Sequence, residues 1–139
     1  MQVRQAMHPG VTWMEPNASI GELARRMRDE DIGAIPIGEN DRLVGMVTDR
    51  DIALRGLSDG RDAQSLTARD VMTDRVIYCR ADEDIEDAVR IMEDQGVRRL
   101  PVIDENKRMV GMLSLGDIAD CGSRDLSAEV VQAVSAHHM

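Results

Sequence analysis

The chain has 139 residues, enough for one compact domain with a modest hydrophobic core. Its formal net charge is −9 and only 1% of its residues are aromatic, which argues against a nucleic-acid partner. No apolar run approaches the roughly 18 residues that span a membrane, and no apolar signal segment opens the chain, so we expect a cytoplasmic protein without a membrane partner.

Taken in order, the chain repeats itself. Met72 lies 65 residues after Met7, and later positions recur at 65 and then 66 residues, because one residue is added in a turn of the second copy. The recurring pairs are Ile20 and Ile85, Met27 and Met92, Pro36 and Pro101, Gly45 and Gly111, and Asp51 and Asp117. A repeat sets the architecture. We therefore predict domains at residues 1–60 and 61–124, followed by a C-terminal helix and tail over 125–139.

Each copy predicts a short helical lead-in and then the order strand, helix, strand, strand, helix. Ser19 with Glu22 forms the signature of a capping box before the first helix, and Asp84 is the expected cap in the second copy. The first copy is expected to have its lead-in at 2–7, strands at 11–14, 34–37 and 42–47, and helices starting at Ile20 and Asp49. The second copy is expected to have its lead-in at 67–72, strands at 76–79, 100–103 and 108–113, and helices starting at Ile85 and Leu115.

The remaining polar residues indicate no catalytic or metal chemistry. Cys79 and Cys121 are far apart and fit no metal or redox spacing, so we expect reduced thiols. His137 and His138 also lack partners at metal-ligand spacing. No His, Cys or Ser arrangement suits nucleophilic catalysis, so we do not expect an enzyme. The expected last helix has Val130, Val131 and Val134 on its apolar side and Asp125 or Ser127 as its cap.

The same sequence pattern ends the hairpin of each copy, at residues 43–52 and 109–118. It reads as a buried strand, a polar corner and the start of a helix, and each corner carries a hydroxyl residue followed three positions later by Asp. The spacing of Thr48 and Asp51, like that of Ser114 and Asp117, fits a capping box in which the carboxylate returns to the N–H of the cap residue.

The β-α-β-β-α order, written twice, resembles the cystathionine β-synthase (CBS) domain pair, also called a Bateman module. The resemblance covers about residues 3–122 and rests on 32–37 with 43–52, and on 96–104 with 110–118. The chain is also similar to the small stand-alone bacterial members. The resemblance implies an α/β (α+β) fold of two CBS domains related by a pseudo-twofold axis. It also implies a sensor for AMP, ADP, ATP or S-adenosylmethionine, bound in clefts between the repeats.

By this resemblance, the ligand's ribose lies at Asp51 and Asp117, because one carboxylate can accept a hydrogen bond from each of two adjacent hydroxyls. Thr48 and Ser114 match a hydroxyl position that reaches the ribose or phosphate. The backbone N–H groups at the start of the following helix are expected to be free to bind an anion. Capping and ribose binding can coexist through different oxygens.

The expected phosphate ligands differ between the copies. Arg50 stands in the first corner where the second copy has Gly116, and Arg98 and Arg99 are present only in the second copy. We therefore expect two unequal sites, the second of which either draws its positive charge from Arg98 or Arg99 or binds a less anionic ligand. The sequence does not decide whether Arg99 serves a phosphate whose ribose is held by Asp51 or by Asp117. The other candidate ligand-binding residues, mostly expected around the adenine, are Thr12, Trp13, Gly33, Ala34, Pro36, Ile77, Tyr78 and Pro101.

No cofactor is expected beyond the ligand itself, which as ATP would bring Mg²⁺. The expected partners are the adenosyl ligand, a second copy in a homodimer and an unidentified regulated protein. The alternative is a ligand-free structural or dimerisation module that uses its apolar helix stripes and acidic surface for protein contacts.

Overall fold

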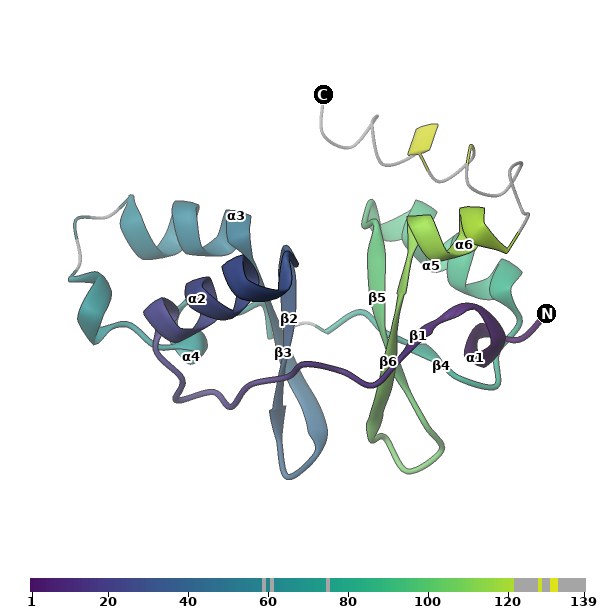
Figure 1. Cartoon of the computed structure of the whole chain (residues 1–139), viewed down its shortest axis with the longest axis horizontal. Helices are drawn as coiled ribbons and strands as arrows, with labels where there is room; N and C mark the ends of the chain where they lie inside the picture. Colours follow the sequence, from purple (N-terminus) through teal and green to yellow (C-terminus); the bar gives the residue numbers. More distant parts are fainter. Residues whose placement is uncertain (59, 61, 75, 122–127, 129–130, 133–139) are drawn as a thin grey trace. The chain divides into compact units, whose positions relative to one another are not determined.

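The computed structural model describes residues 1–58, 60, 62–74, 76–121, 128 and 131–132 (Figure 1). The chain forms two compact units. One, here called the continuous unit, is Thr12–Val76; the other, the split unit, combines Met1–Val11 with Ile77–Met139. Most of the helix expected over 125–139, including both of its candidate caps and His137-His138, lies outside the described residues.

The continuous unit is built from one long helix against a β-hairpin. Ile20, Leu23 and Met27 fall on one face of the helix and are buried. Ser19 caps it, since its Oγ accepts a hydrogen bond from the Glu22 N–H at 3.1 Å. The elements are α2 (Ile20–Glu30), β2 (Ala34–Glu39), β3 (Arg42–Thr48), α3 (Asp49–Asp51), the π-helix η1 (Ile52–Leu57), the 3₁₀-helix η2 (Ala63–Ser65) and α4 (Ala68–Val71).

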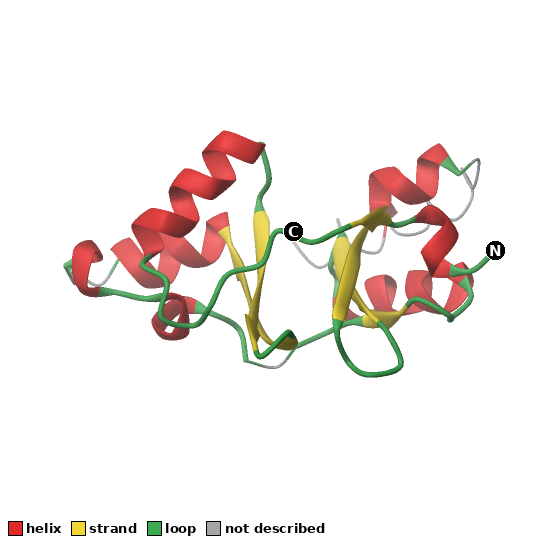
Figure 2. Ribbon diagram, turned by 60° about the horizontal axis from the view of Figure 1, so that its bottom comes forward, coloured by secondary structure: helices red, strands yellow, loops and turns green. Residues whose placement is uncertain are grey.

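The split unit repeats this plan around a four-stranded sheet of order β1-β6-β5-β4. Each unit combines helices with strands (Figure 2). Ile85, Ala88, Val89 and Met92 form the buried face of its long helix, which ends at Gly96 with a φ of 66°, a conformation that glycine adopts without strain. The elements are α1 (Val3–Ala6), β1 (His8–Pro9), β4 (Cys79–Arg80), α5 (Ile85–Gln95), β5 (Arg99–Ile103), β6 (Met109–Ser114) and α6 (Leu115–Asp120).

In the continuous unit, isolated β-bridges flank the hairpin where β1 and β4 flank it in the split unit. Met46 of β3 pairs antiparallel with Thr73, as Met112 of β6 pairs with His8. On the other side, Met14 pairs in parallel with β2, as Cys79 pairs with β5. The two hairpins therefore occupy equivalent places, and the predicted duplication extends to the backbone pairing.

The lead-ins are exchanged between the copies. Val3 of α1 is fully buried in the core formed by the second copy, and Val71 of α4 is fully buried in the core formed by the first. The bridging pairs Gln2 with Asp84 and Ser19 with Thr67 follow the same exchange. The compact units therefore differ from the domains expected at residues 1–60 and 61–124, because each lead-in buries its apolar residue on the other copy's helix and hairpin.

The helices and hairpins expected within the two copies are confirmed, with local corrections. The helix expected to start at Asp49 is instead the short α3 followed by the π-helix η1. The strand expected at 11–14 is reduced to a single β-bridge at Met14. The strand expected at 76–79 is reduced to β4. Asp84 is the N-cap of α5, but its side chain makes no capping bond. Among the described helices, none combines the length and apolar character needed to cross a membrane.

Candidate functional site

The first corner joins β3 to α3 through two reciprocal hydrogen bonds. The Thr48 N–H donates to Asp51 Oδ2 at 2.9 Å, and the Asp51 N–H donates to Thr48 Oγ1 at 3.1 Å. The predicted capping box is therefore present. Asp51 is half-buried, and within the described part of the chain nothing donates to its Oδ1. One carboxylate oxygen is fixed by the cap and the other is open.

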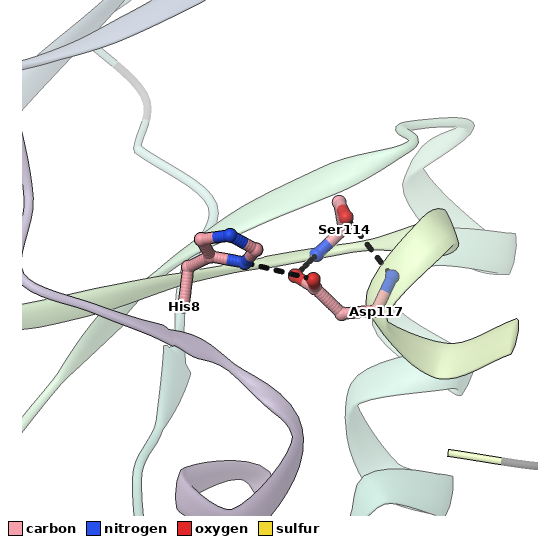
Figure 3. A network of polar contacts seen from close by, with 3 residues as sticks. All are labelled: His8, Ser114 and Asp117. Carbon is pink, nitrogen blue, oxygen red and sulfur yellow. Dashed lines mark hydrogen bonds and ion pairs between the residues drawn. The ribbon is translucent and has the colours of Figure 1, made fainter. Parts of the chain in front are cut away.

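The second corner has the same cap but a different outer contact. Ser114 and Asp117 repeat the reciprocal bonds at 2.9 and 3.1 Å. Asp117 is only 8% exposed, and its Oδ1 lies 3.0 Å from Nδ1 of His8 (Figure 3). His8 reaches this point because β1 pairs it with Met112, two residues before Ser114. Both carboxylate oxygens of Asp117 thus have partners.

The backbone N–H groups expected to bind an anion at the first corner already have acceptors. The Asp49 N–H donates to the Gly33 carbonyl at 3.0 Å, and the Arg50 N–H donates to Asp49 Oδ1 at 2.8 Å. The Asp51 N–H is taken by Thr48. The expectation of free N–H groups is wrong for these three residues, so an anion at this corner depends on side-chain cations.

The structure gives each corner its own arginines. Arg50 is exposed in α3, between Thr48 and Asp51 in sequence. In the split unit, the Arg98 carbonyl accepts the Leu115 N–H at 2.9 Å, and Arg99 pairs with Ser114. Arg98 and Arg99 are therefore backbone neighbours of the second corner. None of the three arginines forms an ion pair with another described residue.

The other candidate residues divide between the units. Ala34 pairs with Thr48 across the hairpin and is buried, so it borders the first corner. The Thr12 hydroxyl donates to Glu30 Oε1 at 2.6 Å. Trp13, Gly33 and Ile77 are half-buried, Pro36 and Pro101 are buried within β2 and β5, and Tyr78 is 39% exposed before β4.

Two surface hollows lie elsewhere. One of about 410 Å³ is in the split unit, between the lead-in and the β5–β6 turn, and one of about 340 Å³ lies along α2. Neither is lined by a corner residue. The first is lined by Arg4, Met7, Ala81, Asp82, Asp104, Glu105 and Val110, and the second by Met14, Glu22, Arg25, Arg26, Asp29 and Glu30.

Neither cysteine belongs to a recognisable site. Cys79 is fully buried, and burial together with the nearby Glu83 charge raises the pKa of its thiol from 9.0 to about 12. Among the residues that the structure describes, no group of three or more His, Cys, Asp or Glu side chains is placed to hold a metal ion. The residue that sequence reasoning missed is His8, because nothing in the lead-in indicates a contact 109 positions away.

Comparison with known proteins agrees with this geometry. The family model for the CBS domain matches twice, at residues 3–57 and 68–123. Hypoxic response protein 1 of Mycobacterium tuberculosis is 43% identical over 117 residues, which are 84% of this chain and 81% of that protein. The CBS domain-containing protein YhcV of Bacillus subtilis is 40% identical over 117 residues, 84% of this chain and 82% of its own length.

Solved structures give the same result. The crystal structure of Hypoxic Response Protein I with two coordinated zinc ions has a TM-score of 0.80 at 40% identity, covering 86% of this chain and 98% of that one. The CBS domain pair of protein MJ0100, in complex with 5-methylthioadenosine and S-adenosyl-L-methionine, has a TM-score of 0.78 at 25% identity, covering 90% and 98%. With both copies matched by the family model, the chain belongs to the CBS domain family, as a tandem pair.

Proposed function

We propose that this chain is a regulatory module that binds an adenosyl ligand and signals its presence to a partner protein. The observation that carries the proposal is the open Oδ1 of Asp51, on a half-buried carboxylate held by Thr48. Support also comes from the relative MJ0100, whose CBS domain pair is described with two adenosyl compounds. We further propose that the module is not itself catalytic.

The chemistry of the corner suits a ribose. The two adjacent hydroxyls of a ribose are donors, and the two oxygens of a carboxylate offer about four lone-pair positions. The cap bond leaves acceptor capacity on Oδ2 and fixes the orientation of Oδ1, so little side-chain entropy is lost on binding. Arg50, exposed beside Asp51, supplies positive charge for a phosphate or another anionic group. Mg²⁺ would enter only as the companion of ATP.

Signalling requires that the ligand prefer one conformation of the chain over another, since a ligand acts only through its difference in affinity between states. The corner joins the hairpin to α3, and α3 continues directly into the π-helix η1. A ligand on Asp51 therefore acts on the element that runs into η1. We propose that a regulated protein reads the resulting change.

The test is calorimetry of the full chain, shown beforehand to be free of nucleotide, with AMP, ADP, ATP and S-adenosylmethionine. We expect at least one of them to bind, and Asp51→Ala to weaken that binding. Asp120→Ala, which alters an exposed carboxylate of α6, is the matched control and should leave affinity unchanged. Absence of heat with all four ligands would refute the proposal.

A ligand-free interaction module is the second candidate, and one observation favours it. Leu54 and Leu57 of η1 are 53% and 58% exposed, so η1 presents two large apolar side chains to solvent. We propose that they contact a second copy of this chain. Sedimentation velocity should show a dimer that Leu57→Glu dissociates, while Leu43→Glu, beside the β2–β3 turn and away from η1 in the sequence, is the control.

A further inference from the structure

The contact between His8 and Asp117 makes the two corners chemically unequal. The His8 Nδ1 lies 3.0 Å from Asp117 Oδ1, while the Ser114 N–H takes Oδ2 (Figure 3). The His8 side chain is 81% exposed and the Asp117 side chain 9%. An exposed imidazole thus contacts the carboxylate oxygen of this corner that the cap does not use.

The first corner has a residue at the backbone position equivalent to His8, but the equivalent side-chain contact is not made. Thr73 holds the position of His8, since it pairs with Met46 as His8 pairs with Met112. Within the described part of the chain, Thr73 makes no side-chain hydrogen bond to Asp51. The inequality therefore comes from one lead-in side chain, His in one copy and Thr in the other, and both lie within the same unit as the Asp that they adjoin.

From this difference we infer that His8 is an intramolecular occupant of the Asp117 corner, so that an adenosyl ligand binds at Asp51 first and at Asp117 only when the imidazole turns away. The inference rests on the proposed function, because it assigns an order to the same two ribose positions. A ribose hydroxyl and the imidazole N–H are both donors and compete for Oδ1. Because His8 is exposed, moving it breaks one contact and empties no part of the core.

The competition is expected to be modest in size. Ion pairs with an exposed partner contribute little to stability, so removing His8 should tighten binding at Asp117 by about three- to fivefold. This effect must be confined to the Asp117 corner. Placing histidine at the equivalent position by Thr73→His should weaken binding at Asp51 by a comparable factor.

The experiment measures AMP and S-adenosylmethionine binding by calorimetry in backgrounds that keep one corner each. In Asp51→Ala, adding His8→Ala should tighten binding about three- to fivefold. In Asp117→Ala, the same addition should change nothing. An equal effect in both backgrounds, no effect in the Asp51→Ala background, or no binding at Asp117 with or without His8 overturns the inference.

The last of these outcomes leaves the proposed function standing if the wild-type chain still binds at Asp51, whereas a wild-type chain that binds neither compound refutes both. Thermal melting of each variant checks folding. An independent measurement needs no substitution: the His8 ring resonances in nuclear magnetic resonance spectra should shift as the second equivalent of ligand binds. Resonances that stay fixed at full saturation also overturn the inference.

Discussion

Asp51 turns one carboxylate oxygen to the backbone N–H of Thr48 and leaves the other without a partner among the described residues. The two interpretations of this motif, helix cap and ribose ligand, therefore use different atoms of one side chain. The motif's spacing does not distinguish them, but a substitution that changes one oxygen and keeps the other does.

Asp51→Asn is expected to separate the two roles. The Asn carbonyl can still accept the Thr48 N–H, so the free energy of unfolding should change by less than about 0.5 kcal/mol. The ligand loses a charged acceptor, which costs about 1.5–3 kcal/mol, or roughly a tenfold to hundredfold loss of affinity. Chemical denaturation and calorimetry measure the two effects. Thr48→Val, which removes the hydroxyl of the cap, should instead cost about 1 kcal/mol of stability.

Arg50 is predicted to recognise the anionic part of the ligand. Arg50→Ala should weaken binding of AMP and ATP by a larger factor than binding of adenosine, because only the nucleotides carry phosphate. Arg26→Ala is the control, since Arg26 lies on α2 and pairs with Glu30 at 3.5 Å. Equal losses for adenosine and AMP would show that Arg50 does not contact the phosphate.

Gly111 is required where the first lead-in crosses β6. A β-carbon there would lie 2.5 Å from the His8 carbonyl oxygen and 2.7 Å from the Met7 sulfur. The equivalent Gly45 would meet the flexible Met72 sulfur at 2.5 Å, but backbone only at 3.2 Å. Gly111→Ala should therefore destabilise the chain by about 1–3 kcal/mol, and Gly45→Ala by less.

The matched control for both glycines is Gly116→Ala. Its β-carbon meets nothing closer than Ser114 Oγ at 3.6 Å, and it lies inside α6. Because alanine favours the helix, this variant should be neutral or more stable by up to about 1 kcal/mol. Thermal or urea unfolding ranks the three. A Gly111→Ala variant as stable as Gly116→Ala would mean that the lead-in is not in close contact with β6 at Gly111.

The buried thiol of Cys79 is expected to make the folded chain less stable at high pH. Burial raises the pKa of its thiol from 9.0 to about 12, so above pH 9 the unfolded chain releases a proton that the folded chain keeps. The Cys79 contribution to stability is thus complete below pH 9, and between pH 9 and 12 it falls by up to about 1.4 kcal/mol per pH unit. Below pH 9 it should not vary.

The measurement compares urea unfolding of the wild type with Cys79→Ala at pH 8 and pH 10. The difference in their pH dependence isolates the contribution of the Cys79 thiol. A thiol reagent at neutral pH should modify the half-buried Cys121 in the native chain and reach Cys79 only after unfolding. Rapid labelling of both thiols in the native state would contradict the fully buried position of Cys79.

Local patterns in the sequence were sufficient to predict the main helices and hairpins and the capping boxes at both corners. The apolar spacing around Ile20 and Ile85 predicted α2 and α5, and the repeated hydroxyl and Asp predicted both capping boxes. These features depend on residues a few positions apart. The division of η1 from α3 was not foreseen, because residues 52–57 carry no signal that distinguishes a π-helix from an α-helix.

The long-range contacts could not be predicted from the sequence either. Val3 and Val71 have the same apolar character whichever copy they pack on, so no pattern indicated that the lead-ins are exchanged. The contact of His8 with Asp117 depends on that exchange, because only the exchanged lead-in runs beside β6. A single histidine near the N-terminus gave no reason to expect it.

The exchanged lead-ins amount to a domain swap within one polypeptide. A single copy with its own lead-in would expose the apolar residue of that lead-in and leave a matching gap in its core, unless a second copy filled it. It follows that residues 12–76, which contain every buried residue of one core, form a better minimal folding segment than residues 1–60.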